Sequence, residues 1–176
     1  LGEALRKKVS VKAQNLEDNA VKMVIYDIHF TATDALKIDF VEDAIDLLKK
    51  TKTVDGINIL SLEDIYLRKL YALAGMIKTL DDVGQNRFIG GRTAAKDFYD
   101  VYFLSHTFMP LSKFVSKYCN LTMKEAIVKW FQTYDRMTMM DGVLTLETNK
   151  VIDCKTMEKH FKKEVGSIID HELGGI

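Results

Sequence analysis

The chain has 176 residues, 47% hydrophobic and 28% charged, and its 25 basic and 25 acidic residues cancel to a formal net charge of zero. This composition is typical of a folded globular domain, excludes a disordered or fibrous chain, and argues against binding nucleic acid or anionic membrane through an overall field. No apolar segment reaches the roughly 20 residues of a membrane helix, and two cysteines fit neither a disulfide framework nor a zinc site, so we expect a cytoplasmic protein without a membrane partner.

The first sixty residues combine period-2 alternation with turn signals, which predicts about three strands and two short helices. In chain order we expect a helix over 3–13, antiparallel strands over 21–31 and 35–42, a helix over 43–50, and a strand over 54–60 that an Asp55-Gly56 turn opens. These elements would form a small α/β core over residues 1–60.

From Ser61 onward the hydrophobic period becomes helical. Ser61 with Asp64, and Thr122 with Glu125, have the spacing of capping boxes. We expect a helix over 61–78, a long loop over 79–92, a helix from a Thr93 cap to about 105, a helix with Pro110 in its first turn, one after Thr122, and a last helix over 156–173. The predicted fold class is α+β, with a helical region over residues 61–176.

Asp39 is the first charged residue in an unexpected place. Alternation along 35–41 puts Leu36, Ile38 and Phe40 on one face, which should meet the core, and Asp39 on the other. A carboxylate held in a fixed direction by a strand suits a hard cation such as Mg²⁺. A solvated outer face explains the same pattern.

Lys69 is the second charged residue in an unexpected place. At 100° per residue it falls near the middle of the apolar stripe of its helix, whereas Asp64 and Arg68 fall opposite. Such a lysine either extends to the edge of the stripe or pairs with an anion, and an ammonium aimed into a cleft would suit a phosphate.

The third unexpected place is occupied by a pair of charged residues, Asp97 and Asp100. They lie three residues apart on one face of an otherwise apolar helix, where like charges repel unless cations hold them. Lys96, Lys69 or a metal ion could do so, and the alternative is a pair exposed at the rim of the helix. Arg87 and Arg92 flank Gly90-Gly91 within reach of a phosphate, but we favour a mobile surface turn there.

The order and spacing of these segments resemble the nucleotidyltransferase toxins of the AbiEii/AbiGii abortive-infection family, including the MenT-type toxins. The resemblance covers roughly residues 36–104. It is carried by Lys37-Ile38-Asp39-Phe40, by Ile59-Leu60-Ser61-Leu62-Glu63-Asp64 leading into Lys69-Leu70-Tyr71-Ala72-Leu73, and by Lys96-Asp97-Phe98-Tyr99-Asp100-Val101-Tyr102.

The resemblance implies a partial sheet like that of DNA polymerase β, about three strands, joined to a helical C-terminal region. It implies that Asp39 is a metal-binding and catalytic acid, that Lys69 contacts a nucleoside triphosphate, and that Asp97 belongs to the catalytic set. Asp100 would be the second acid of the Asp-x-x-Asp motif, and Lys96, in place of the commoner arginine, would bind nucleotide with Lys69 and Asp100.

One departure from the family pattern concerns residues 1–36, which contain no Gly-Ser stretch followed by Asp-x-Asp. Because Asp39 alone cannot supply a two-metal site, and because the chain starts with Leu1, we expect the chain to be the C-terminal part of a longer enzyme. A degenerate member of the family that has lost its chemistry is the alternative.

The implied reaction is the Mg²⁺-dependent transfer of a nucleoside monophosphate from a triphosphate to an acceptor hydroxyl. RNA or a protein is the candidate acceptor, and an antitoxin protein is a candidate partner, since family members act as toxins. A different class of function also fits the residues: a non-catalytic binding module in which Lys69 and Asp97 form a buried ion pair.

Overall fold

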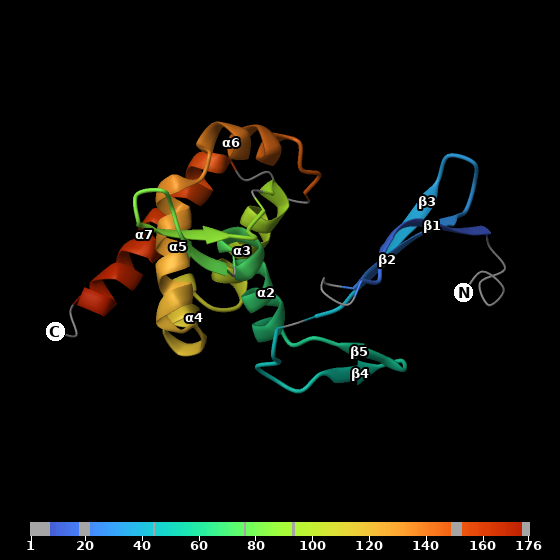
Figure 1. Cartoon of the computed structure of the whole chain (residues 1–176), viewed down its shortest axis with the longest axis horizontal. Helices are drawn as coiled ribbons and strands as arrows, with labels where there is room; N and C mark the ends of the chain where they lie inside the picture. Colours follow the sequence, from blue (N-terminus) through green and yellow to red (C-terminus); the bar gives the residue numbers. More distant parts are fainter. Residues whose placement is uncertain are drawn as a thin grey trace. The chain divides into compact units, whose positions relative to one another are not determined.

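A computed structural model of the chain describes residues 8–17, 22–43, 45–75, 77–92, 94–148 and 153–173 (Figure 1). The chain divides into two compact units, Leu1–Asp46 and Leu47–Ile176, and each is described by itself. The expected domain boundary after residue 60 stays a prediction.

The first unit contains a three-stranded antiparallel sheet in the order β1 (Lys8–Asn15), β2 (Met23–His29) and β3 (Ala35–Val41). The predicted antiparallel pairing of the strands over 21–31 and 35–42 is confirmed by the pairing of β2 with β3, whose register sets Ile25 opposite Asp39. In the tight turn between them, the hydroxyl of Thr31 accepts hydrogen bonds from the backbone N–H groups of Thr33 and Asp34.

Two expectations for this region were wrong in the described residues. β1 is a strand where a helix over 3–13 was predicted, because its backbone pairs with β2 on both sides of an irregularity between Val11 and Ala13. No helix forms in the described part of 43–50. There, the backbone N–H groups of Leu48 and Lys49 donate to the carboxylate of Asp64 rather than to helical carbonyls.

The apolar face of β3 also differs from expectation. Leu36 and Phe40 remain about half exposed, although Phe40 makes an edge-to-face contact with Tyr26 at 5.9 Å between ring centroids. In the described part of the first unit the sheet has no helix packed on it. The strand pattern therefore predicted the alternation correctly but not the burial of these two side chains.

The second unit begins with a two-stranded hairpin, and Asp55 and Gly56 form its turn. Both have positive φ, at 50° and 80°, as a type I′ hairpin turn requires at its two central residues. The elements of this unit are β4 (Lys52–Val54), β5 (Ile57–Ile59), α2 (Leu62–Ala74), β6 (Ile77–Leu80), β7 (Asn86–Ile89), α3 (Ala95–Thr107), α4 (Leu111–Tyr118), α5 (Leu121–Thr133), α6 (Arg136–Leu144) and α7 (Cys154–Leu173).

The core of this unit is aromatic and joins helices that are distant in sequence. Phe98 of α3 stacks on Phe161 of α7 at 4.7 Å between centroids, and Tyr66 of α2 stacks on Phe114 of α4 at 4.2 Å. All four rings are fully buried. Helices α2 and α3 also pack directly on each other, and these two helices carry Lys69, Asp97 and Asp100.

Helix α2 ends earlier than predicted, and the segment after it is not a loop. Gly75 caps the helix at φ 85°, a conformation that glycine adopts without the steric penalty of other residues, and its N–H donates to the carbonyl of Tyr71. The chain then forms the β6–β7 hairpin, drawn in green beside α5 in Figure 1, where a loop over 79–92 was expected.

The helix starts show which local signals were correct. Ser61 caps α2 as predicted, and its hydroxyl accepts from the N–H of Asp64. The cap of α5 is Asn120 rather than Thr122, and Thr93, the expected cap of α3, lies outside the described residues. Helix α6 was not predicted. The α+β class, with a three-stranded sheet followed by helices, is confirmed.

In the described part of the chain, no helix combines the length and the apolar character needed to cross a bilayer.

Candidate functional site

The ammonium of Lys69 lies between two carboxylates of the neighbouring helix. Its Nζ is 2.9 Å from Oδ1 of Asp97 and 2.6 Å from Oδ2 of Asp100. Arg92 completes the group, because its Nε and Nη2 donate to the two oxygens of Asp97 at 2.6 and 3.1 Å. We call Lys69, Arg92, Asp97 and Asp100 the Lys69–Asp97 cluster.

Asp97 is the buried centre of the cluster. Its side chain has no exposed surface, whereas those of Lys69, Asp100 and Arg92 are 26%, 41% and 59% exposed. A buried carboxylate is tolerated only when its charge and its lone pairs are matched, and here two cations match them. The cluster therefore presents a lysine and an arginine toward solvent, and the buried carboxylate of Asp97 holds both in place.

The protonation states follow from these contacts. Burial alone would raise the pKa of Asp97, but the hydrogen bonds from Arg92 and Lys69 outweigh it and hold that pKa below its usual value. Burial would lower the pKa of Lys69, but Asp100 and Asp97 outweigh it and raise that pKa. Lys69 is thus an ammonium at neutral pH, suited to bind an anion and not to accept a proton.

The β6–β7 hairpin positions Arg92. A Cβ on Gly91 would lie 2.6 Å from the carbonyl oxygen of Leu73, so the chain passes against the end of α2 at a distance that only glycine permits. The backbone N–H of Arg92 then donates to the carbonyl of Ala72 at 2.7 Å. The arginine that the sequence placed on a mobile surface turn is fixed against α2 by its backbone and against Asp97 by its side chain.

Asp64 is a buried acid whose role the sequence pattern missed. It is fully buried, although the helical projection placed it opposite the apolar stripe. Its carboxylate accepts from the N–H groups of Leu48 and Lys49 and from the hydroxyl of Ser61, and Arg68 lies 3.3 Å away. It holds the segment before β4 against α2, and we assign it a structural role.

The remaining predicted site residues lie outside the cluster. Lys96 is exposed on α3, with no ion pair to any residue of the described ranges. Asp39 belongs to the first unit, where its carboxylate is 43% exposed and accepts from Nζ of Lys37 at 2.9 Å. The structure thus brings together Lys69, Asp97 and Asp100, while Asp39 and Lys96 remain predicted site residues.

Within the part of the chain that the structure describes, no three histidine, cysteine, aspartate or glutamate side chains are grouped closely enough to hold a metal ion. Asp97 has both oxygens bound by cations. These described residues do not form a metal cage made of protein ligands alone.

The buried acids predict an acid limit to stability. Because the pKa values of Asp97 and Asp64 lie below those of an unfolded chain, near 3.9, the native state is favoured while both are ionised. We therefore expect the free energy of unfolding to fall as the pH drops below about 4. Urea unfolding followed by circular dichroism between pH 7 and pH 2.5 measures this.

The exposed capping residues Asp135 and Asp153 also have lowered pKa values, so their protonation lowers stability in acid as well. A variant of Asp97 is therefore needed to measure the contribution of the buried acid. Stability of Asp97→Asn should depend less on pH than that of the unmodified protein. An equal pH dependence in both proteins would contradict the role given to Asp97.

Comparison with known proteins identifies the family. Residues 6–174 match the model of the family described as nucleotidyl transferase AbiEii toxin, of a type IV toxin–antitoxin system. The match spans nearly the whole chain, and the chain belongs to this family. The family resemblance predicted from residues 36–104 is thereby confirmed.

Two solved structures are also similar to the chain. One, from H. pylori, is described as a "putative nucleotidyltransferase"; it is 14% identical, the match covers 92% of this chain and 69% of that one, and the TM-score is 0.49. The other, JHP933 from Helicobacter pylori, is 17% identical over 96% of this chain and 68% of that one, also with a TM-score of 0.49. A comparison with curated proteins found no match.

Proposed function

We propose that this protein transfers a nucleoside monophosphate from a nucleoside triphosphate to an acceptor hydroxyl, as a toxin paired with an antitoxin. In this reaction the acceptor oxygen forms a bond to the α-phosphorus, the bond between that phosphorus and the α–β bridging oxygen breaks, and pyrophosphate leaves. Family membership supports the reaction class, and the acceptor, RNA or protein, is part of the proposal.

The observation that carries the proposal is the paired presentation of Lys69 and Arg92. Phosphoryl transfer depends on positioned cations that match the charge of the phosphate oxygens. Asp97 fixes the direction of both cations without being exposed itself. In our proposal Lys69 and Arg92 bind triphosphate oxygens, Asp97 is the positioning acid, Asp100 tunes the position of Lys69, and the exposed Lys96 adds a further cation for the nucleotide.

Asp39 receives a separate role. Mg²⁺ in such enzymes is commonly held by one or two carboxylates together with substrate phosphates and water. An exposed carboxylate on a regular strand fits one such ligand to an ion that arrives with the triphosphate, and we propose Asp39 for it. When bound, the ion would neutralise phosphate charge, and Asp39 would help to accept the proton of the attacking hydroxyl.

The binding of triphosphate tests the proposal directly. We expect at least one of ATP, GTP, CTP and UTP with Mg²⁺ to bind in isothermal titration, and Lys69→Ala to weaken binding about 10- to 100-fold, because a hydrogen bond between charged groups is lost. The control is Lys162→Ala, which removes the same charge from an exposed position of α7. Transfer of an α-³²P-labelled monophosphate to RNA or protein measures the reaction.

A non-catalytic module is the second candidate, and one observation favours it. Both carboxylates that face Lys69 already compensate its charge. In that case no triphosphate would bind to the intact protein, and Lys69→Ala would change only stability. This outcome would reject the enzymatic proposal.

A further inference from the structure

Two adjoining cavities flank helix α5 in the second unit, with volumes of about 400 and 390 Å³. Both are lined by Phe88 of β7 and Lys129 of α5. None of the four residues of the Lys69–Asp97 cluster lines either cavity. Each is within the range of roughly 300–1,000 Å³ that is usual for small-molecule sites.

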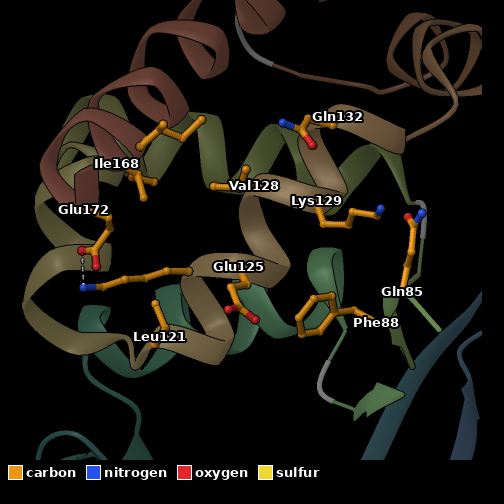
Figure 2. Close-up of a pocket in the computed structure, with 11 residues that line it drawn as sticks. Gln85, Phe88, Leu121, Glu125, Val128, Lys129, Gln132, Ile168 and Glu172 are labelled. Atoms are coloured by element: carbon orange, nitrogen blue, oxygen red, sulfur yellow. Dashed lines mark hydrogen bonds and ion pairs between the residues drawn. The ribbon is translucent and has the colours of Figure 1, made fainter. Parts of the chain in front are cut away.

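The two cavities differ in chemistry. The first, which we call the apolar chamber, has walls from Phe88, Leu121, Val128 and Ile168, with the side-chain amides of Gln85 and Gln132 at its edge (Figure 2). The second, which we call the cationic chamber, is lined by Arg87, Lys129, Trp130 and Thr133. In Figure 2 Lys129 extends from α5 toward Gln85, above Phe88. The same lysine lines the cationic chamber.

The charges around these chambers are unbalanced. Each carboxylate that lines them has a partner: Lys78 pairs with Glu125 at 2.6 Å, Lys124, which lines the apolar chamber too, pairs with Glu172 at 2.6 Å, and Asp135 caps α6. By contrast, neither Arg87 nor Lys129 has an ion pair with any acid in the described ranges. The cationic chamber thus has two cations without an ion pair and one carboxylate that caps a helix, a net positive charge that favours an anionic ligand. A guanidinium with an ammonium suits phosphate.

The apolar chamber defines the other half of the ligand. A flat ring can stack on Phe88, since base–aromatic stacking tolerates any base. The amides of Gln85 and Gln132 each offer both a donor and an acceptor, the combination that matches the edge of a nucleobase. A ligand with a phosphate at one end and a planar polar-edged ring at the other satisfies both chambers at once.

We propose that the two chambers form one binding site for a nucleoside phosphate, separate from the Lys69–Asp97 cluster. Arg87 and Lys129 bind the phosphate, and Phe88 with the two amides contacts the base. The phosphate can belong to a free nucleotide or to a nucleic-acid strand, because both offer the same chemistry to these side chains.

Trp130 provides the readout. It is the single tryptophan of the chain and it lines the cationic chamber. Because the indole lines the chamber, its fluorescence should change when a ligand enters beside it. Titrations followed by tryptophan fluorescence would compare AMP, adenosine, inorganic phosphate and an oligoadenylate hexamer.

We expect saturable quenching by AMP or by the hexamer, and at least tenfold weaker binding of adenosine, because it lacks the phosphate. Lys129→Ala and Arg87→Ala should each weaken binding about tenfold, whereas Lys162→Ala, on an exposed face of α7, should not. Saturation by AMP would identify a free nucleotide, and saturation by the hexamer alone would identify a strand. Absence of saturable quenching by either, or equal affinity for AMP and adenosine, would overturn the proposal.

Failure of this proposal can be told apart from failure of the proposed function. If binding of AMP is lost in Lys69→Ala but kept in Lys129→Ala and Arg87→Ala, the nucleotide binds at the Lys69–Asp97 cluster. That result would reject the site in the two chambers and leave the proposed function standing. The site in the two chambers is supported if Lys69→Ala still binds AMP and Lys129→Ala binds it more weakly.

Discussion

Replacing Asp97 by asparagine is expected to lower both the stability of the second unit and nucleotidyl transfer, more than any other single change in the cluster. The variant keeps the shape of the side chain but removes the charge that holds Lys69 and Arg92. Breaking a fully buried ion pair costs about 3–5 kcal/mol. Because both cations can reach water, we expect a smaller loss, about 2–3 kcal/mol, in urea unfolding.

The effect on activity has a different origin from the effect on stability. Without Asp97 the guanidinium of Arg92 has no carboxylate partner in the cluster and Lys69 keeps only the half-exposed Asp100. A displacement of about 1 Å in a positioning group can lower a rate about 100-fold. We therefore expect transfer of labelled monophosphate to fall by about that factor, at a temperature where the variant is still folded.

Asp100→Asn is the matched control. It removes an equal charge from the same helix and contacts the same lysine, but its side chain is 41% exposed. An exposed ion pair contributes about 0.2–1 kcal/mol, so the stability should change little. If Asp97→Asn and Asp100→Asn lose equal stability, the buried acid does not have the central role assigned here.

Lys69 and Asp97 show what the sequence could predict about this site. A lysine within an apolar stripe and two acids on an apolar helix are anomalies within one element each, and local periodicity detects them. The pairing of Lys69 with both acids was among the options that this pattern left open, and the structure selects it. The projection was less reliable for burial, because α2 packs on more than one side: Asp64 is buried and Leu62 is half exposed.

Arg92 shows what could not be predicted. Its place depends on the β6–β7 hairpin, whose strands have four residues each, and on a close approach between Gly91 and the end of α2. Short strands carry too little alternation to stand out from a loop, and the approach joins Gly91 to residues 16 to 18 positions earlier in the sequence. The Gly90-Gly91 pair before the arginine was the available signal, but glycine pairs are equally typical of mobile turns.

Gly91→Ala tests whether this close approach positions the site. The new Cβ would lie 2.6 Å from the carbonyl oxygen of Leu73 and 2.8 Å from the backbone nitrogen of Gly75. Both atoms belong to the backbone, so no side chain can rotate to relieve the contact. The segment that follows β7 must therefore shift. We expect a loss of about 1–3 kcal/mol in the free energy of unfolding, as for other overpacked sites.

The shift should also move Arg92, whose N–H is bonded to Ala72, away from Asp97. Gly91→Ala should then weaken triphosphate binding as much as Arg92→Ala does, and the double variant should bind no more weakly than either single one. Gly166→Ala is the control, because a Cβ there meets nothing within 4 Å in the middle of α7. It should stabilise the protein by about 0.5–1 kcal/mol and leave binding unchanged. Additive losses in the double variant would show that Gly91 does not act on the nucleotide through Arg92.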